Sequence, residues 1–272
     1  MRLLTPLALV LMLLLTCAPA QVRKEAPRPS GKVSKVEKAA KTAAEVPAGE
    51  LAEAAARTVV CIDPGHPSEV ASGQNLQNGT SEAHVDWAVA AKLREVLEAR
   101  GYEVVMTKSS EGELVRNKER ALVANRARAA VMLRLHCDAS AQRGFAVYYP
   151  DRKGRAKDGT AGPGPVVIEE SRRAAEAVHS GLSEGLRGAL EDNGVRTDYQ
   201  TKVGREQGGA LTGSIFSEVP VVTIEMVTLS DPGDAEFIKT EEGQRRMAES
   251  IADGVARYVA PTKAAGPARK AP

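Results

Sequence analysis

The sequence predicts an α/β domain, with a mostly parallel or mixed central sheet and helices on both faces. Two observations lead to this prediction. Short apolar stretches typical of buried strands alternate along the chain with longer segments in which apolar residues recur at helical spacing. Such alternation favours parallel strands joined by helical crossovers that cover both faces of the sheet. The alternating part, residues 57–260, has the length of one domain with a substantial core.

The first strand is predicted at residues 59–66, VVCIDPGH, an apolar stretch that ends abruptly in a rigid turn. A loop rich in Gly, Asn and Ser follows it. The next helix is predicted over residues 81–101, where apolar residues recur at helical spacing from Val85 onward. The Thr-Ser pair at 80–81 can cap the start of this helix, and Gly101 suits its end.

Three more strands are predicted in the middle of the chain: YEVVMT at residues 102–107, VMLRLH at 131–136 and FAVYYP at 145–150. A helix is predicted over residues 111–130, and it runs straight into the second of these strands. A loop rich in Gly and Pro, around residues 159–165, follows the third strand.

A long amphipathic helix is predicted next. Its periodic residues begin at Val167 and continue to Leu186, and Asn193-Gly194 is expected to end it. The last strand is VPVVTIEM, residues 219–226. A closing helix carries an apolar residue at every fourth position over residues 247–259.

The two ends of the chain differ in composition from the domain. Residues 1–20 contain one Arg, then a Leu-rich run, then Ala-Pro-Ala. The run is shorter than the roughly 20 residues that span a bilayer, so a secretory signal peptide is predicted, and with it a periplasmic or cell-envelope location. Residues 21–56 and 261–272 are rich in Ala and Lys and are predicted to be a flexible linker and a disordered tail.

Two further features bear on partners. The stretch LLTC resembles a lipoprotein box, so a membrane tether is expected only if Cys17 is lipidated. The formal net charge of +2 gives no reason to expect nucleic acid as a partner. Cys61 and Cys137 are predicted to be free, buried thiols, because they lie at different heights in the sheet, where a disulfide has unfavourable geometry.

Three polar residues end predicted strands: His66, His136 and Glu225. In an open α/β sheet, functional groups gather beyond the carboxyl ends of the strands. A fourth residue, Glu82, lies in the first turn of the following helix, and the long loop before it can fold back so that Glu82 faces His66. Two His and one carboxylate form an open zinc set, and a second carboxylate would activate the bound water. Each residue alone also has a structural interpretation, but together they favour a metal site.

Two neighbours of Glu82 were weighed as ligands. Asp86 shares the same helix face at i+4 and is the alternative carboxylate. His84 lies two positions from Glu82, on roughly the opposite side of the helix, and is not expected to be a ligand.

The stretches IDPGH, ERALVANRARAAVMLRLHCDAS and VPVVTIEM, with Glu82 between the first two, resemble the zinc-dependent N-acetylmuramoyl-L-alanine amidases of the AmiC-like, amidase-3 family. The resemblance covers residues 57–260. It implies Zn²⁺ (zinc) held by His66, Glu82 and His136, with Glu225 as the catalytic carboxylate. It also implies hydrolysis of the amide between N-acetylmuramic acid and L-alanine in peptidoglycan, a substrate outside the inner membrane.

The chain departs from the family pattern at three places. The usual DPGHGG is DPGHPS here, which stiffens the loop at Pro67-Ser68. The usual Ser two residues before the second His is Arg134, on the same strand face as His136. Arg134 could bind a carboxylate of the stem peptide or pair with a structural acid. The usual E-G-F-x-S-N end is EMVTLSDPGD. None of these changes removes a ligand implied by the family, so a divergent enzyme is expected.

Two other functions stay open. One is a non-catalytic peptidoglycan-binding or regulatory protein on the same fold, and the other is a zinc peptidase acting on stem peptides. Some amidases of this type carry an inserted helix that plugs the zinc site until an activator protein removes it. Residues 151–220 show one amphipathic helix and no spare one, so an open site is expected here.

Overall fold

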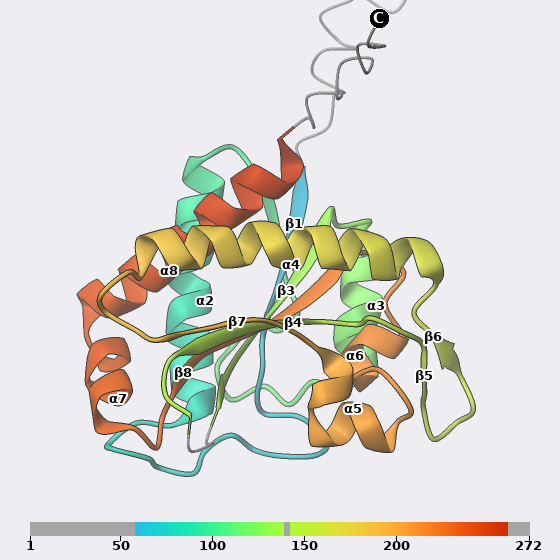
Figure 1. Cartoon of the computed structure of the whole chain (residues 1–272), viewed down its shortest axis with the longest axis horizontal. Coiled ribbons are helices and arrows are strands. Elements are labelled where there is room, and N and C mark those ends of the chain that lie inside the picture. The colour runs from blue at the N-terminus through green and yellow to red at the C-terminus, as the bar shows by residue number, and fades with distance from the viewer. Residues whose placement is uncertain (1–57, 139–141, 261–272) are drawn as a thin grey trace, which may run out of the picture. The chain divides into compact units, whose positions relative to one another are not determined.

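A six-stranded sheet lies between two layers of helices in the computed structural model, which describes residues 58–138 and 142–260 (Figure 1). The predicted fold class is confirmed. The strands of this sheet are β1 (Val59–Pro64), β2 (Glu103–Met106), β3 (Val131–Asp138), β4 (Phe145–Tyr149), β7 (Asp192–Thr197) and β8 (Val221–Thr228). Two short strands, β5 (Gly154–Arg155) and β6 (Ala161–Gly162), pair with each other in the loop predicted after β4.

The strand order β2-β1-β3-β8-β4-β7 sets four parallel strands side by side, from β2 to β8. Strand β4 runs antiparallel to β8, and β7 runs parallel to β4, so the sheet is mixed. The carboxyl ends of β1, β3 and β8 therefore meet at one edge of the sheet. In the β3–β8 register, Arg134 lies opposite Thr223 and His136 opposite Glu225. In the β1–β3 register, Asp63 lies opposite Arg134.

The helices divide between the two faces of the sheet. They are α2 (Glu82–Ala99), α3 (Asn117–Ala127), α4 (Pro165–Gly185), α5 (Lys202–Glu206), α6 (Thr212–Ile215), α7 (Pro232–Lys239) and α8 (Glu241–Val259), with a single 3₁₀ turn at Asp198–Gln200. Helices α2, α4 and α8 pack against one another on one face, and α4 and α8 cross in front of the strands in Figure 1. Helix α3 covers the other face together with α6.

Alternate strand residues point to opposite faces and build two cores of unequal size. The larger core lies under α2, α4 and α8, and Val60, Ile62 and Leu133 belong to it. The smaller core lies under α3 and contains Cys61 and Met132. Cys61 is buried and free, as is Cys137 in β3, which confirms the prediction for both thiols.

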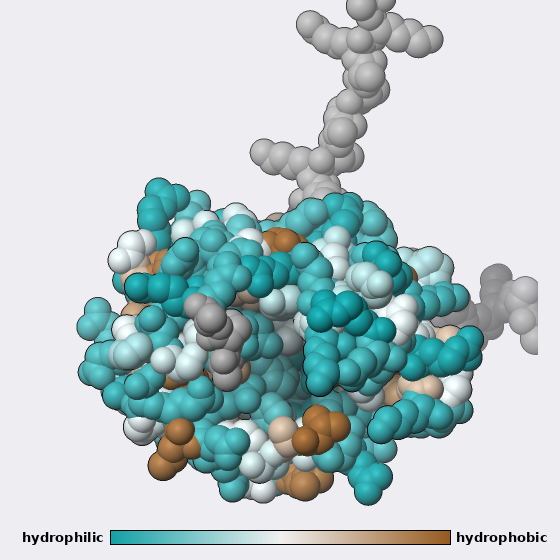
Figure 2. All heavy atoms as spheres, turned by 60° about the horizontal axis from the view of Figure 1, so that its bottom comes forward, coloured by the Kyte–Doolittle hydropathy of each residue, from teal (hydrophilic) through white to brown (hydrophobic). Residues whose placement is uncertain are grey.

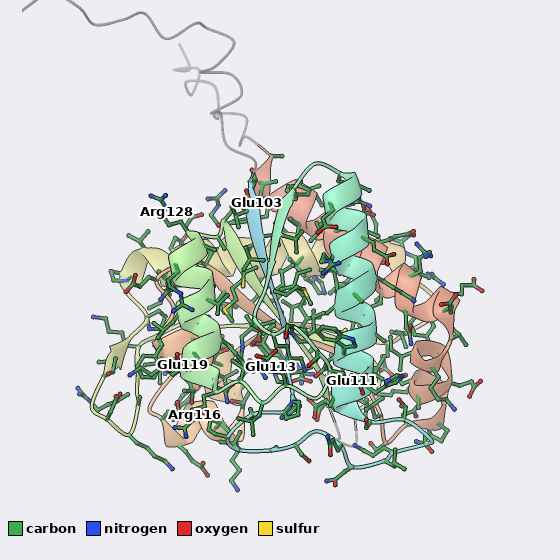
Figure 3. The ribbon with its side chains drawn as sticks, turned by 180° about the vertical axis from the view of Figure 1, so that it is seen from behind. Glu103, Glu111, Glu113, Arg116, Glu119 and Arg128 are labelled. Atoms are coloured by element: carbon green, nitrogen blue, oxygen red, sulfur yellow. The ribbon has the colours of Figure 1, made fainter. Side chains whose placement is uncertain are left out.

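The predicted helix over residues 111–130 is shorter than expected and begins only at Asn117. Side chains hold the preceding stretch out of a helix: the Glu113 carboxylate accepts hydrogen bonds from the Ser109 backbone N–H and hydroxyl group, at 2.6 and 2.8 Å. Figure 3 shows Glu111 and Glu113 on this irregular segment, and Arg116 and Arg128 at the two ends of α3.

The predictions for the second half of the chain need two corrections. Helix α4 ends at Gly185, and Asn193-Gly194 lies inside the edge strand β7 rather than at a helix end. Strand β7, DNGVRT, has no apolar alternation, and its pairing with β4 could not be seen in its composition. The short helices α5, α6 and α7 were also missed, because segments of four to eight residues carry too few turns to show a period.

The predicted signal peptide at 1–20, the linker at 21–56, the lipidation of Cys17 and the tail at 261–272 lie outside the described residues. Within the described part of the chain, no helix has the length and apolar character needed to cross a membrane.

A test of the helix layer uses Gly181, where α4 meets α8. A Cβ atom at Gly181 would lie 2.4 Å from the Ser250 carbonyl oxygen and 2.5 Å from the Gly254 backbone nitrogen. We expect Gly181→Ala to lower the free energy of unfolding by about 1–3 kcal/mol in urea titrations, since the backbones must separate. Gly112→Ala, where a Cβ meets nothing within 4 Å, is the matched control and should stay within about 0.5 kcal/mol of the wild type.

Candidate metal centre

His66, Glu82 and His136 come together at the carboxyl edge of the sheet, from three different elements. His66 follows β1, Glu82 is the first residue of α2, and His136 lies in β3. The Glu82 Oε1 atom is 3.3 Å from His66 Nε2 and 3.1 Å from His136 Nδ1. One ligand atom from each residue lies within 4.8 Å of the others, so the three could hold a metal ion. Their side chains are between 12% and 21% exposed, which leaves the group open on one side.

The loop after β1 orients the His66 ring. Its Nδ1 atom lies 3.0 Å from the carbonyl oxygen of Ala71. Because a carbonyl can only accept, this nitrogen carries a proton, and Nε2 is the ring atom turned toward Glu82. Gly73, at φ 65°, packs its backbone against the ring: a Cβ there would lie 2.3 Å from His66 Cβ. Gly65 serves His136 in the same way, since a Cβ would lie 2.5 Å from its Cε1.

A buried ion cluster lies directly beneath these rings, and the carboxylate of Asp63 is its centre. Asp63 Oδ1 lies 2.6 Å from Arg120 Nη1, and Asp63 Oδ2 lies 3.0 Å from Arg134 Nε. The Thr107 hydroxyl group donates a third hydrogen bond to Asp63, at 2.5 Å. Burial alone would raise the pKa of Asp63, but the charges of Arg120 and Arg134 outweigh it and hold this pKa below its usual value.

The same cluster fixes the main chain on both sides of His66. Arg120 donates to the carbonyl of Pro64 at 2.6 Å and to that of Pro67 at 2.7 Å. Lys108 donates to the carbonyl of His66 itself. Three main-chain acceptors in four residues are thus held by two buried cations, so the turn cannot shift without breaking buried hydrogen bonds.

The electrostatics of Glu82 and His136 favour a neutral imidazole beside a carboxylate, whereas at His66 burial lowers the pKa but the hydrogen bond and charge of Glu82 outweigh it and raise this pKa. Burial acts to raise the pKa of Glu82, but hydrogen bonds and charge from His136 and His66 lower it to about 2. Burial lowers the pKa of His136 and favours its neutral form. Both are the protonation states in which these side chains bind a metal.

Glu225 lies opposite His136 in the adjoining strand and completes the predicted set of four residues. Its Oε2 atom is buried and has no hydrogen-bond partner among the described residues. Burial raises the pKa of Glu225 to about 8, with a further contribution from the negative charges of Glu82 and Asp138. A buried carboxyl oxygen without a partner is costly unless a ligand or water meets it.

The two alternative ligands lie outside this group. Asp86 is fully buried, and its Oδ1 atom accepts a hydrogen bond from the thiol of Cys137 at 3.6 Å. His84 pairs instead with Glu111 at 3.2 Å. Among the described residues, the group that could hold a metal ion comprises only His66, Glu82 and His136.

Sequence reasoning missed Asp63, Arg120 and Thr107 as supports of the site. The one signal that could have revealed them is Arg120, which interrupts the apolar face of a helix and would need a buried acid. Arg134 forms the pair with a structural acid that was one of its two predicted roles.

A cavity of about 310 Å³ opens beside the metal group, lined by His66, His136, Glu225 and residues of the segment from α5 to α6. Figure 2 brings this edge of the sheet forward and shows hydrophobic residues standing out on a mostly hydrophilic face. Val70 and Val203, which are 77% and 44% exposed, lie at the cavity. No side chain of residues 151–220, all of which are described, belongs to the group of residues that could hold a metal ion.

Two imidazoles and one carboxylate, with a further carboxylate beside them, are the donor set of single-metal zinc hydrolases. Comparison with known proteins places the chain among amidases. The family model of the Amidase_3 family, N-acetylmuramoyl-L-alanine amidase, matches residues 60–257, and the chain belongs to this family. The AmiC amidase of Neisseria meningitidis is 28% identical over 229 residues, which are 75% of this chain and 53% of that protein. The chain thus spans about half the length of this curated relative.

Solved structures show the same fold at low sequence identity. AmiC2 of Nostoc punctiforme is 21% identical with a TM-score of 0.59, and the match covers 75% of this chain and 97% of that one. The CwlD amidase of Clostridioides difficile, solved in complex with the GerS lipoprotein, is 20% identical with a TM-score of 0.56. That match covers 74% of this chain and 98% of CwlD.

The ion cluster under the site is tested by Asp63→Asn. At neutral pH we expect this variant to lose about 3–5 kcal/mol of unfolding free energy, because two guanidinium groups lose their buried counter-charge. The folded-state pKa of Asp63 lies below its unfolded value of about 3.9. The wild-type advantage is therefore fully present above that value and disappears as the pH falls through the folded pKa.

Urea titrations between pH 3 and pH 7 measure this difference. Asp253→Asn is the matched control, because Asp253 is 51% exposed in its pair with Arg100, and it should cost less than about 1 kcal/mol throughout. A variant Asp63→Asn that is as stable as the wild type at pH 7 would contradict the proposed role of the cluster.

Proposed function

We propose that this chain is a zinc-dependent N-acetylmuramoyl-L-alanine amidase, which hydrolyses the amide between N-acetylmuramic acid and L-alanine in peptidoglycan. One observation carries the proposal: in a chain of the Amidase_3 family, His66, Glu82 and His136 converge within 4.8 Å and Glu225 lies beside them. The non-catalytic alternative would predict the loss of one of these groups, and all four are present.

The donor set fits zinc. His66 and His136 each turn one ring nitrogen toward the same Glu82 oxygen, and the second nitrogen of His66 is bonded to the Ala71 carbonyl. His66, Glu82 and His136 would hold the ion through two imidazole nitrogens and a carboxylate oxygen. When bound there, zinc lowers the pKa of a coordinated water toward about 7 and polarises the scissile carbonyl.

Glu225 is the residue that would move the proton. Its unpartnered Oε2 atom would accept a proton from the attacking water and deliver it to the nitrogen of the leaving L-alanine. Burial raises the pKa of Glu225 to about 8, and the positive charge of a bound zinc ion would lower this pKa again, toward about 7. A pKa near the working pH suits a group that must first take a proton and then release it.

Export to the cell envelope follows from the predicted signal peptide at residues 1–20 and from the position of the substrate. Peptidoglycan is the proposed partner. CwlD forms a complex with the GerS lipoprotein. For this chain we infer that no activator is needed to uncover the site, because the cavity reaches His66, His136 and Glu225 past the side chains of Thr201 to Thr212.

The first experiment measures metal and activity together. The chain without residues 1–20 is purified, its zinc is quantified, and it is incubated with peptidoglycan before and after treatment with a chelator. About one zinc ion per chain and chelator-sensitive release of stem peptides with free L-alanine amino groups support the proposal. A zinc peptidase would instead leave L-alanine attached to muramic acid, which mass spectrometry of the products detects. Zinc without any release would favour the binding protein.

The roles of the site residues are tested by single substitutions. We expect Glu225→Gln to keep its zinc and lose about 10²–10⁴-fold in kcat, since only the proton acceptor is removed. His66→Ala should lose both zinc and activity. His84→Ala is the matched control, because its ring pairs with Glu111 outside the metal group, and it should retain both. Full activity of Glu225→Gln would refute the assignment of the base.

A further inference from the structure

A second row of polar residues lies one step behind the metal group on the same face of the sheet. Arg134 precedes His136 by two residues in β3, and Thr223 precedes Glu225 by two residues in β8. Arg134 and Thr223 are opposite each other in the register, as are His136 and Glu225. Residues two apart in a strand share a face and are separated by about 6.6 Å. All four line the same cavity of about 310 Å³.

Thr223 makes no hydrogen bond through its side chain. Its Oγ1 atom is buried and has no hydrogen-bond partner among the described residues, and the whole residue is only 4% exposed, so water does not readily take the place of a partner. A structural Thr at such a position would be expected to bond a neighbour, because a buried hydroxyl group without a partner is costly. A hydroxyl group directed at the cavity is satisfied when a ligand fills it.

Arg134 brings a buried positive charge to the cavity, and one of its donors has no acceptor among the residues that the structure describes. It is 4% exposed, and its Nε atom pairs with Asp63, whose single charge is already shared with Arg120. Its Nη2 atom donates to the amide oxygen of Asn117 at 2.7 Å. No hydrogen bond of Nη1 occurs within the described part of the chain. The buried carboxyl groups of Asp198 and Glu225 also interact with the charge of Arg134, and burial raises the pKa of both. Nη1 is the donor of this guanidinium group that is left without an acceptor among the described residues, and a carboxylate in the cavity would supply one.

The surroundings make room for this guanidinium group. Gly213, at the start of α6, packs its backbone on it: a Cβ there would lie 2.9 Å from Arg134 Cζ and 3.0 Å from Nη1. The family pattern has Ser at position 134, so the cation in the cavity distinguishes this chain from that pattern. Val203 and Leu211 line the cavity with Arg134 and exclude water from one side of the charge.

We propose that Arg134 and Thr223 form a carboxylate-binding subsite, which recognises the free carboxylate of the glutamate that follows L-alanine in the stem peptide. The proposal rests on the proposed function and names the part of the substrate that this cavity selects. The guanidinium Nη1 and the Thr223 hydroxyl group both donate to the carboxylate. In an extended stem peptide, two residues span at most about 7 Å. Thr223 and Glu225, two residues apart in β8, are separated by a similar distance, so a peptide whose scissile amide lies at Glu225 can place its next carboxylate at Thr223.

The test uses two muropeptides with the same tripeptide stem, one with the α-carboxylate of this glutamate free and one with it amidated. We expect wild-type protein to hydrolyse the carboxylate form with a kcat/KM at least about tenfold higher, since charge-assisted hydrogen bonds are lost with the amide. Equal kcat/KM values for the two substrates would overturn the subsite while leaving the amidase function in place.

Thr223→Val is the decisive variant, because it keeps the shape of the side chain and removes only a hydroxyl group that no protein atom uses. We expect KM for the carboxylate substrate to rise about tenfold, and the preference for it over the amide substrate to fall, because a hydrogen bond to a charged acceptor is worth more than one to a neutral amide. The melting temperature should not fall. Thr58→Val, just before β1 at the opposite edge of the sheet, is the matched control and should change neither substrate. An unchanged KM in Thr223→Val contradicts the proposal.

Arg134→Ser, which restores the family residue, should abolish the preference between the two substrates. Its stability is measured alongside, because Arg134 also pairs with Asp63, and Thr223→Val decides the question if this variant does not fold.

Binding separates failure of the subsite from failure of the proposed function. Chelator-treated protein is titrated calorimetrically with the free peptide L-alanyl-γ-D-glutamyl-diaminopimelate and with its α-amide. Tighter binding of the carboxylate peptide by wild type, lost in Thr223→Val, supports the subsite even if neither muropeptide is hydrolysed. Equal binding of the two peptides by wild type overturns it.

Discussion

The buried carboxylate of Asp63 is the interaction on which the rest of the site depends. It lies in β1, one residue before the end of the strand, and binds Arg120 of α3 and Arg134 of β3, so it connects one helix and two strands. Arg120 then extends the tie to the carbonyls of Pro64 and Pro67. A charge in a protein interior is tolerated only with its partners in place, and this requirement makes the arrangement strict. The main chain on both sides of His66 is thus held by this buried ion cluster, while the Ala71 carbonyl and the Gly73 backbone orient the ring itself.

The parallel register of β3 and β8 places two rows of polar residues on one face of the sheet: Arg134 with Thr223, and His136 with Glu225. Along β3 and β8, the residues between the rows, Leu135 and Ile224, point into the larger core and are fully buried. The alternation that buries them leaves His136 and Glu225 on the opposite face. A shift of one residue in either strand would turn the candidate site residues into the core and expose core residues, so stability and the proposed site require the same register.

The sequence carried enough information to predict this edge but not what supports it. His66, His136 and Glu225 lie within three residues of the carboxyl ends of β1, β3 and β8, and parallel strands bring these ends together whatever the details of packing. The supports depend on register and on side-chain reach: nothing local to Arg120 states that its partner lies 57 residues away. Strand β7 and the short helices were not predicted for a related reason. Strand β7 is defined by its pairing with β4, and a helix such as α5 is too short to show a periodicity of its own.

The departure from the family pattern after His66 can be read in the same terms. The family's Gly-Gly is Pro67-Ser68 here, and both residues contribute to holding the His66 ring. The Pro67 carbonyl accepts hydrogen bonds from Arg120 and from the Val115 backbone N–H, at 2.7 and 3.3 Å. The Ser68 backbone N–H donates to the Ala71 carbonyl at 2.9 Å, and that carbonyl also accepts from His66 Nδ1. Glycines could make the same backbone hydrogen bonds, so what Pro67 and Ser68 change is the flexibility of the loop. A stiffer loop, already held by these bonds, leaves the imidazole less conformational freedom to lose on binding a metal, so this divergence preserves the site.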